Sequence, residues 1–342
     1  MDDINIRYLA KELNLSISTV SKALKDSYEI SIETKKRVVA RAKELNYQPN
    51  PYASSLRRKK SNTVAVVVPE VADSFFSAAL KGIEDIAQTK GYHVLIYLTY
   101  ESYLQEKEIL EKFQNGRVDG LLVSVSSETT NIEHIRALYN NIPIVFFDRA
   151  VEDMEAARVT TNDFESGFIA TKHLIDCGCS NIVYLSISKH LAINNKRIAG
   201  FEKALSDNDM NFNDSNVINC SNDLTYNEKL LSQLMKGEDG PDAIIAGVEK
   251  LITPVYSVCN DLKINIPSQL KVVCFSNLSV AHILNPALTT VTQPAFEMGK
   301  IAAQLLFKKI EKKGSAIENE SIVLPSALII RESTNCGNSN KT

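Results

Sequence analysis

Polar side chains that could hold a small ligand follow several predicted buried strands, at the point where each strand ends. The apolar runs 64–68, 144–147 and 272–275 are each followed by aspartate, arginine, serine or asparagine within a few residues. In open α/β sheets, ligands bind at the carboxyl ends of the strands. Aspartate and arginine make directional, charge-assisted hydrogen bonds, which suit a polyhydroxylated ligand such as a sugar. The candidates are Asp73, Ser74, Phe75, Asp148, Arg149, Arg197, Ser276 and Asn277.

No comparable pattern indicates catalysis. The five histidines are scattered without metal-ligand spacing, and no strand–helix junction carries a glycine-rich nucleotide loop. Ser186 and Ser276 end predicted strands, but no nucleophile-elbow glycines surround them. The sequence therefore predicts no catalytic residue, no metal site and no cofactor. The six cysteines lack Cys-x-x-Cys spacing, so we expect reduced thiols rather than disulfides or zinc ligands.

Strand-like apolar runs alternate with helical segments from residue 63 onward, in two successive series. Repeated βα units predict an α/β fold with doubly wound parallel sheets, and two series predict two lobes. We expect Arg197 at the start of a helix. Asp148 and Arg149 could alternatively form an ion pair between the lobes, and Asn162–Asp163 is better explained as the cap of the helix that follows.

Charge is distributed unevenly along the 342 residues. Residues 1–60 contain 13 Lys/Arg and 7 Asp/Glu, whereas residues 61–342 contain 25 and 34. A basic N-terminal unit on an acidic body indicates a nucleic-acid partner for the first unit. No apolar run is long enough to span a membrane, and the N-terminus does not have the pattern of a secretory signal, so we expect a cytoplasmic protein.

Residues 4–47 contain neither glycine nor proline, and their apolar spacing predicts three short helices. Asn14 suits the left-handed turn after the first helix, and Ser16 and Ser31 can cap the second and third. This arrangement is a helix-turn-helix. The second helix, residues 17–24, carries small or hydrogen-bonding side chains that would let its backbone approach a major groove. A plain three-helix bundle with solvated hydroxyls is the alternative.

The segment 47–60 joins the two units and admits two interpretations. Pro49 and Pro51 exclude a helix at its start, and residues 52–57 allow at most two helical turns, too few to persist alone in water. It is either an exposed, charged linker or a helix that folds only on nucleic acid. Asn50 could cap that helix, and Leu56 is an apolar side chain beside four cations.

Residues 6–10 (IRYLA), 15–24 (LSISTVSKAL), 45–50 (LNYQPN) and 53–57 (ASSLR) resemble the headpiece of LacI/GalR-type bacterial transcription regulators. The resemblance implies a leucine wedge into the minor groove of a palindromic operator at Leu56, and a homodimer. It also implies a periplasmic-binding-protein-like body with an effector between the lobes. The DNA-contact candidates are Ser16, Ile17, Ser18, Thr19, Ser21, Lys22, Asn50, Tyr52, Ala53, Ser55, Leu56 and Arg57.

By the same resemblance, Asp148, Arg197 and Ser276 occupy effector-contacting positions, and Phe75 lies near the cleft. Two departures change the expected ligand: the stretch 274–277 (CFSN) lacks the usual carboxylate, and Val248 replaces a usual asparagine. A less hydroxylated or phosphorylated effector is therefore an alternative to a simple sugar. Lys22 stands where an arginine is common and lacks the bidentate fork that reads guanine.

We therefore expect a ligand-responsive transcription repressor with a carbohydrate effector, rather than a transport receptor or an enzyme. The predicted units are a helix-turn-helix domain (1–48), a hinge helix and linker (49–60), an effector-binding and dimerisation core (61–335) and a disordered tail (336–342). Within the core, the N-lobe comprises about 61–160 and 290–322, and the C-lobe about 161–289 and 323–335.

Overall fold

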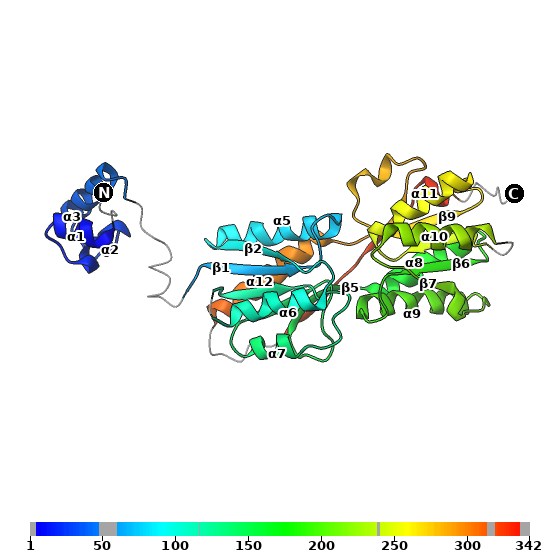
Figure 1. Ribbon diagram of the computed structural model, residues 1–342, viewed down its shortest axis with the longest axis horizontal. Coiled ribbons are helices and arrows are strands. Elements are labelled where there is room, and N and C mark those ends of the chain that lie inside the picture. Colours follow the sequence, from blue (N-terminus) through cyan, green and yellow to red (C-terminus); the bar gives the residue numbers. More distant parts are fainter. Residues whose placement is uncertain (1–4, 48–59, 116, 238–239, 313–318, 336–342) are drawn as a thin grey trace. The chain divides into compact units, whose positions relative to one another are not determined.

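The computed structural model describes residues 5–47, 60–115, 117–237, 240–312 and 319–335. The chain divides into two compact units, Met1–Ser61 and Asn62–Thr342. Each unit has its own hydrophobic core. The two units are described separately below (Figure 1).

Within residues 5–47, the first unit contains helices α1 (Ile6–Glu12), α2 (Ile17–Leu24) and α3 (Ile32–Glu44). The predicted caps are confirmed: Ser16 accepts a hydrogen bond from the amide of Thr19, and Ser31 accepts one from the amide of Thr34. Asn14 has φ of 54°, the left-handed conformation expected between the first two helices. The core is closed by apolar side chains from all three helices, namely Leu9, Ala10, Val20, Ala23, Val38 and Ala42.

The second unit contains two six-stranded sheets, one in each lobe. In the first sheet the order is β11-β5-β4-β3-β1-β2, and in the second it is β12-β10-β9-β8-β6-β7. All described strand pairs are parallel except β10 with β12. The first-sheet strands are β1 (Thr63–Val68), β2 (His93–Leu98), β3 (Gly120–Val123), β4 (Ile144–Phe147), β5 (Ala157–Thr161) and β11 (Ser321–Leu324). The second-sheet strands are β6 (Ile182–Ser186), β7 (Val217–Asn219), β8 (Ala243–Ala246), β9 (Lys271–Phe275), β10 (Thr289–Thr292) and β12 (Ala327–Ile329).

Helices cover both faces of each sheet, so the predicted doubly wound α/β fold is confirmed (Figure 1). Alternate residues of β1 explain this: one set packs under α5 and α12, the other under α6 and α7, and the strand is apolar throughout. The first-lobe helices are α5 (Ser74–Thr89), α6 (Tyr103–Glu111), α7 (Glu133–Tyr139) and α12 (Ala295–Glu311). The second-lobe helices are α8 (Asp163–Asp176), α9 (Ala192–Ser206), α10 (Leu224–Lys236) and α11 (Ile252–Leu262).

Within the described residues, the chain passes between the lobes three times: after β5, after β10, and between β11 and β12. Hydrogen bonds join these crossings. The amide of Asn162 donates to the carbonyl of Leu324 (3.1 Å), and the amide of Ser326 donates to Asn162 Oδ1 (2.8 Å). Gln293 Nε2 donates to Thr161 Oγ1 (3.2 Å). Asn162 occupies the N-cap position of α8, as expected, but its side chain makes no capping hydrogen bond to the helix.

The structure corrects other details of the predicted elements. Arg197 lies in the second turn of α9, not at the start of a helix, because α9 begins at Ala192. Residues 290–292 are expected in the N-lobe but belong to the second sheet as part of β10. Residues 323–324 are expected in the C-lobe but belong to the first sheet as part of β11. Cys177 is disulfide-bonded, so the expectation of reduced thiols is wrong there.

Helices that are both long and apolar enough to cross a membrane do not occur in the part of the chain that the structure describes.

Candidate ligand-binding cleft

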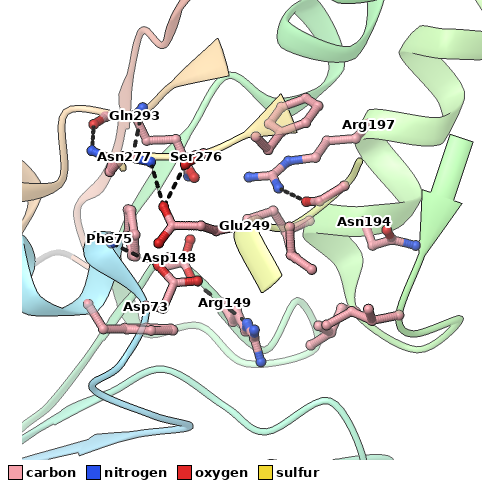
Figure 2. Close-up of a pocket in the computed structure, with 17 residues that line it drawn as sticks. Asp73, Phe75, Asp148, Arg149, Asn194, Arg197, Glu249, Ser276, Asn277 and Gln293 are labelled. Atoms are coloured by element: carbon pink, nitrogen blue, oxygen red, sulfur yellow. Dashed lines mark hydrogen bonds and ion pairs between the residues drawn. The ribbon is translucent and has the colours of Figure 1, made fainter. Parts of the chain in front are cut away.

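Seven of the eight ligand candidates named first from the sequence line one cleft between the two lobes (Figure 2). They come from both lobes. Most lie in loops after strands, where ligand sites of open sheets are expected, whereas Phe75 lies in α5 and Arg197 in α9. The cleft encloses a volume of only about 40 Å³. The seven are Asp73, Phe75, Asp148, Arg149, Arg197, Ser276 and Asn277; Val248 also lines the cleft, and Ser74 is not among its lining residues.

Two carboxyl groups of the first lobe face the cleft. Asp73 caps α5 by accepting from the amide of Phe75 (2.8 Å). Burial and the neighbouring Glu249 raise the pKa of Asp73 to about 7. Burial likewise raises the pKa of Asp148 to about 6, although Arg149 and Arg197 act against that rise. Both carboxyl groups are therefore protonated more readily than an exposed aspartate.

Arg149 is held inside its own lobe. Its Nη1 donates to both carboxylate oxygens of Glu101, at 3.0 and 2.8 Å, and its Nε lies 3.7 Å from Asp148 Oδ2. Burial opposes ionisation of Glu101, but the guanidinium of Arg149 overcomes it and lowers the pKa of Glu101 to about 2. The ion pair of Arg149 is thus formed within one lobe, not between lobes. Lys250 of the second lobe lies 3.9 Å from Glu101 and 3.6 Å from Glu70.

Arg197 is the buried cation of the second lobe. Its Nε donates to Asp163 Oδ1 (2.9 Å), its Nη1 donates to the carbonyl of Gly247 (2.9 Å), and its guanidinium lies 4.1 Å from the centre of the Phe275 ring. Its Nη2 is buried and has no hydrogen-bond partner among the described residues. A group with this unused donor at the cleft can bind a ligand oxygen.

The backbone around Arg197 is fixed by close packing of α8 against α9. A Cβ atom on Gly167 would lie 2.1 Å from the carbonyl oxygen of Arg197, and one on Gly200 would lie 2.0 Å from that of Phe164. Only glycine at these positions lets the helices approach so closely. The position of Arg197 relative to Asp163, at the start of α8, follows from this contact.

The principal cleft residue that the sequence did not mark is Glu249, which lies in a short 3₁₀ turn after β8. Its Oε1 accepts from the amide and the hydroxyl of Ser74, at 3.1 and 2.8 Å. Its Oε2 accepts from the hydroxyl of Ser276 (2.6 Å) and the amide of Asn277 (3.1 Å). Ser74 belongs to the first lobe, whereas Ser276 and Asn277, whose bonds to Glu249 are drawn in Figure 2, belong to the second. Other unmarked lining residues include Phe76, Asn194, Phe275 and Gln293.

The DNA-contact candidates of the first unit lie on and before α2. Ile17, Ser18 and Lys22 are exposed, and Thr19 and Ser21 are half-buried. The hydroxyl of Ser16 is used locally, since it lies 2.8 Å from Thr19 Oγ1. Lys22 forms an ion pair with Glu29. The remaining candidates, Asn50, Tyr52, Ala53, Ser55, Leu56 and Arg57, lie outside the described residues.

A helix-turn-helix unit joined to a two-lobed α/β body defines a DNA-binding regulator with a ligand-binding domain. Comparison with known families agrees: residues 5–50 match the bacterial regulatory proteins of the lacI family, and residues 171–334 match a periplasmic binding protein-like domain. The chain thus combines a lacI-type DNA-binding region with a periplasmic binding protein-like domain, as the resemblance predicts, and its named relatives are lacI family regulators. Its relatives are transcriptional regulators and not enzymes.

Individual relatives cover nearly the whole chain. Catabolite control protein A of Priestia megaterium is 28% identical over 336 residues, which are 97% of this chain and 99% of that protein. The ribose operon repressor of Halalkalibacterium halodurans is 29% identical over 334 residues, 97% of each. The solved lac repressor dimer, bound to operator and the anti-inducer ONPF, has the same fold, with a TM-score of 0.84 at 19% identity over 97% of this chain and 99% of that one.

Proposed function

We propose that this regulator is a repressor that binds a palindromic operator as a homodimer, with an affinity set by a small effector in the interlobe cleft. We further propose that the effector is a carbohydrate or a derivative of one. The observation that carries the proposal is the convergence of seven sequence-marked side chains, from both lobes, on one cleft.

The chemistry of the cleft supports a ligand with several hydroxyl groups. Carboxyl groups of Asp73 and Asp148 accept hydrogen bonds, and the unused Nη2 of Arg197 donates one. Phe75 and Phe275 add apolar surface on which a sugar ring can pack. One relative is named a ribose operon repressor, and one structure with the same fold is a CelR–cellobiose complex (TM-score 0.72, 22% identity).

The surface of the first unit supports DNA binding through α2. Ile17 is 41% exposed at the start of this helix, beside the exposed Ser18 and Lys22. An apolar side chain can contact a thymine methyl group, and lysine can contact a guanine edge or a phosphate. In this proposal the hinge residues 50–57 fold on the operator, and Leu56 enters the minor groove between base steps.

The second unit offers apolar surface for a homodimer. Strand β2 lies at one edge of the first sheet, and its Leu95 and Ile96 are 42% and 49% exposed. In the second lobe, Tyr226 and Ile283 are 51% and 68% exposed. Two-fold pairing through such surfaces would match the symmetry of a palindromic site.

The control mechanism requires only a modest energy difference. Effector binding changes how the lobes close, the paired hinge segments order or melt, and operator affinity changes. A coupling of about 1–3 kcal/mol, or roughly 5–150-fold in affinity, is enough. Whether the effector lowers or raises operator affinity determines whether it is an inducer or a corepressor.

The test is titration of a labelled palindromic duplex with the full-length protein, with and without candidate sugars, followed by fluorescence anisotropy. We expect Leu56→Ala to weaken operator binding at least tenfold while leaving binding to a random duplex nearly unchanged, because unspecific binding depends on charge. Operator affinity unaffected by Leu56→Ala would refute the hinge mechanism. A protein that binds sugar but no duplex would instead be a ligand receptor.

A further inference from the structure

The carboxylate of Glu249 occupies a site built entirely of hydrogen-bond donors. Two backbone amides and two hydroxyls, from Ser74, Ser276 and Asn277, point at its two oxygens over 2.6–3.1 Å. Lysine and arginine side chains make no ion pair with Glu249 in the ranges that the structure describes. The charge of Glu249 is therefore stabilised by oriented dipoles, as in anion-binding sites of proteins.

Two features favour an anion at this position independently of Glu249, although the carboxyl group of Asp73, whose pKa burial and Glu249 raise, lies nearby. Ser74 is the first residue of α5, a helix of 16 residues whose N-terminal amides carry partial positive charge. Arg197, whose residue is only 4% exposed, lines the same cleft with its Nη2 unpartnered. An arginine nitrogen without an acceptor is costly in a buried site, so a ligand oxygen near it is favoured.

The space beside Glu249 is too small for an effector. The cleft volume of about 40 Å³ is well below the roughly 300–1,000 Å³ of pockets that enclose small-molecule ligands. A ligand as large as a sugar must therefore displace part of the protein. Glu249 is the group best placed to leave, because it lies on a three-residue 3₁₀ turn and not within a strand.

We propose that Glu249 is an internal ligand of an oxyanion site shared by the two lobes, and that the effector carries a carboxylate or phosphate group that takes its place. The inference rests on the proposed function, because it assumes that this cleft binds the effector. A ligand carboxylate in place of Glu249 would leave the charge beside Asp73 and Asp148 unchanged, whereas a phosphate group, with about −1.5 to −2 at pH 7, would make it more negative. In the absence of effector, Glu249 holds the lobes together through Ser74.

The first experiment is chemical rescue of the full-length Glu249→Ala variant, followed by thermal unfolding. Acetate or inorganic phosphate should raise the Tm of the variant saturably by about 3–6 °C, the shift expected when an anion fills the vacated site at roughly tenfold its Kd. Acetamide and glucose, which carry no charge, should not. The better of the two anions identifies the effector group as carboxylate or phosphate.

The matched control is Glu70→Ala, which removes a carboxylate that also faces the other lobe but is paired with Lys250. Acetate should raise the Tm of this variant and of the wild type no more than potassium chloride does at equal ionic strength. Absence of anion rescue in Glu249→Ala, or equal rescue by acetamide, would overturn the proposal.

Hydrogen exchange provides a second test should Glu249→Ala not fold. In Glu249→Gln the side chain keeps its size but loses its charge and one acceptor oxygen. The amides of Ser74 and Asn277 should then exchange at least about tenfold faster, because each loses its charged acceptor. Unchanged exchange at both amides would contradict the internal-ligand role. If anions rescue Glu249→Ala but no ligand changes operator affinity, the anion site is supported and the proposed function is refuted.

Discussion

Removal of Asp163 should leave the buried guanidinium of Arg197 without its charged partner. The side chains of Asp163 and Arg197 are 4% and 5% exposed, so water cannot replace the lost acceptor. Breaking a buried ion pair from one side typically costs about 3–5 kcal/mol. Since Arg197 Nη2 is already unpartnered, Asp163→Ala would leave only the bond to Gly247, and we expect a loss in the upper half of that range.

The assay is equilibrium unfolding of the full-length protein in urea, with a thermal scan in parallel. At roughly 2–4 °C per kcal/mol for a large domain, a loss of about 4–5 kcal/mol should lower the Tm by at least about 8 °C. Arg197→Met completes a double-mutant cycle, because methionine fills much of the same space without charge. The double variant should be more stable than the sum of the single losses predicts.

A loss below about 1 kcal/mol in Asp163→Ala would refute this reasoning. It would mean that water reaches the guanidinium, and that the unpartnered Nη2 is not a desolvated donor waiting for a ligand. Additive single losses would equally contradict the coupling between the two side chains.

Three further predictions concern other parts of the chain. Because the pKa of Glu101 is lowered from 4.5 to about 2, its carboxylate contributes stability of about 3 kcal/mol above pH 4.5, which is lost as the pH falls toward 2. As the pH is lowered through that range, the urea midpoint of unfolding should fall less steeply for Glu101→Gln than for the wild type. Glu29→Gln should release Lys22 for phosphate contact. Binding to a random duplex should then tighten about two- to fivefold at low salt and depend more steeply on salt concentration. Anisotropy titrations at two salt concentrations that show neither change would contradict this prediction. Gly200→Ala should lower the unfolding free energy by more than about 3 kcal/mol, because its Cβ would overlap the carbonyl of Phe164 in the second lobe. In the control Gly237→Ala, the nearest atom to the new Cβ lies at 3.6 Å, so the unfolding free energy should change by less than about 1 kcal/mol.

The features that the sequence predicted correctly are those set by neighbouring residues. The caps at Ser16 and Ser31 need only a hydroxyl and an amide three residues away, and the apolar run of β1 is sufficient to indicate a buried strand. Asp73, Asp148 and Ser276 could be placed at the cleft because each follows a parallel strand, and parallel strands bring their carboxyl ends to one edge. The carboxylate of Glu249 could not be assigned in this way, because its partner Ser74 is 175 residues distant.

Elements without a local signature were missed for related reasons. Strand β11 has alternating exposed and half-buried residues, and it is defined by pairing with β5, about 160 residues earlier. Helix α11 contains Pro254 in its first turn, where proline is tolerated but where the sequence pattern suggests a break. Glu101 is a buried charge whose burial depends on the position of Arg149.

The three crossings between the lobes restrict the motions that any ligand can produce. A single tether would let one lobe swivel and slide over the other. Three short tethers joined by hydrogen bonds through Asn162, Gln293 and Ser326 oppose both twisting and translation. The movement that these tethers oppose least is hinge bending about the line of the crossings, which opens or closes the cleft. Ligands of different shape would therefore produce different amounts of one movement along a single coordinate.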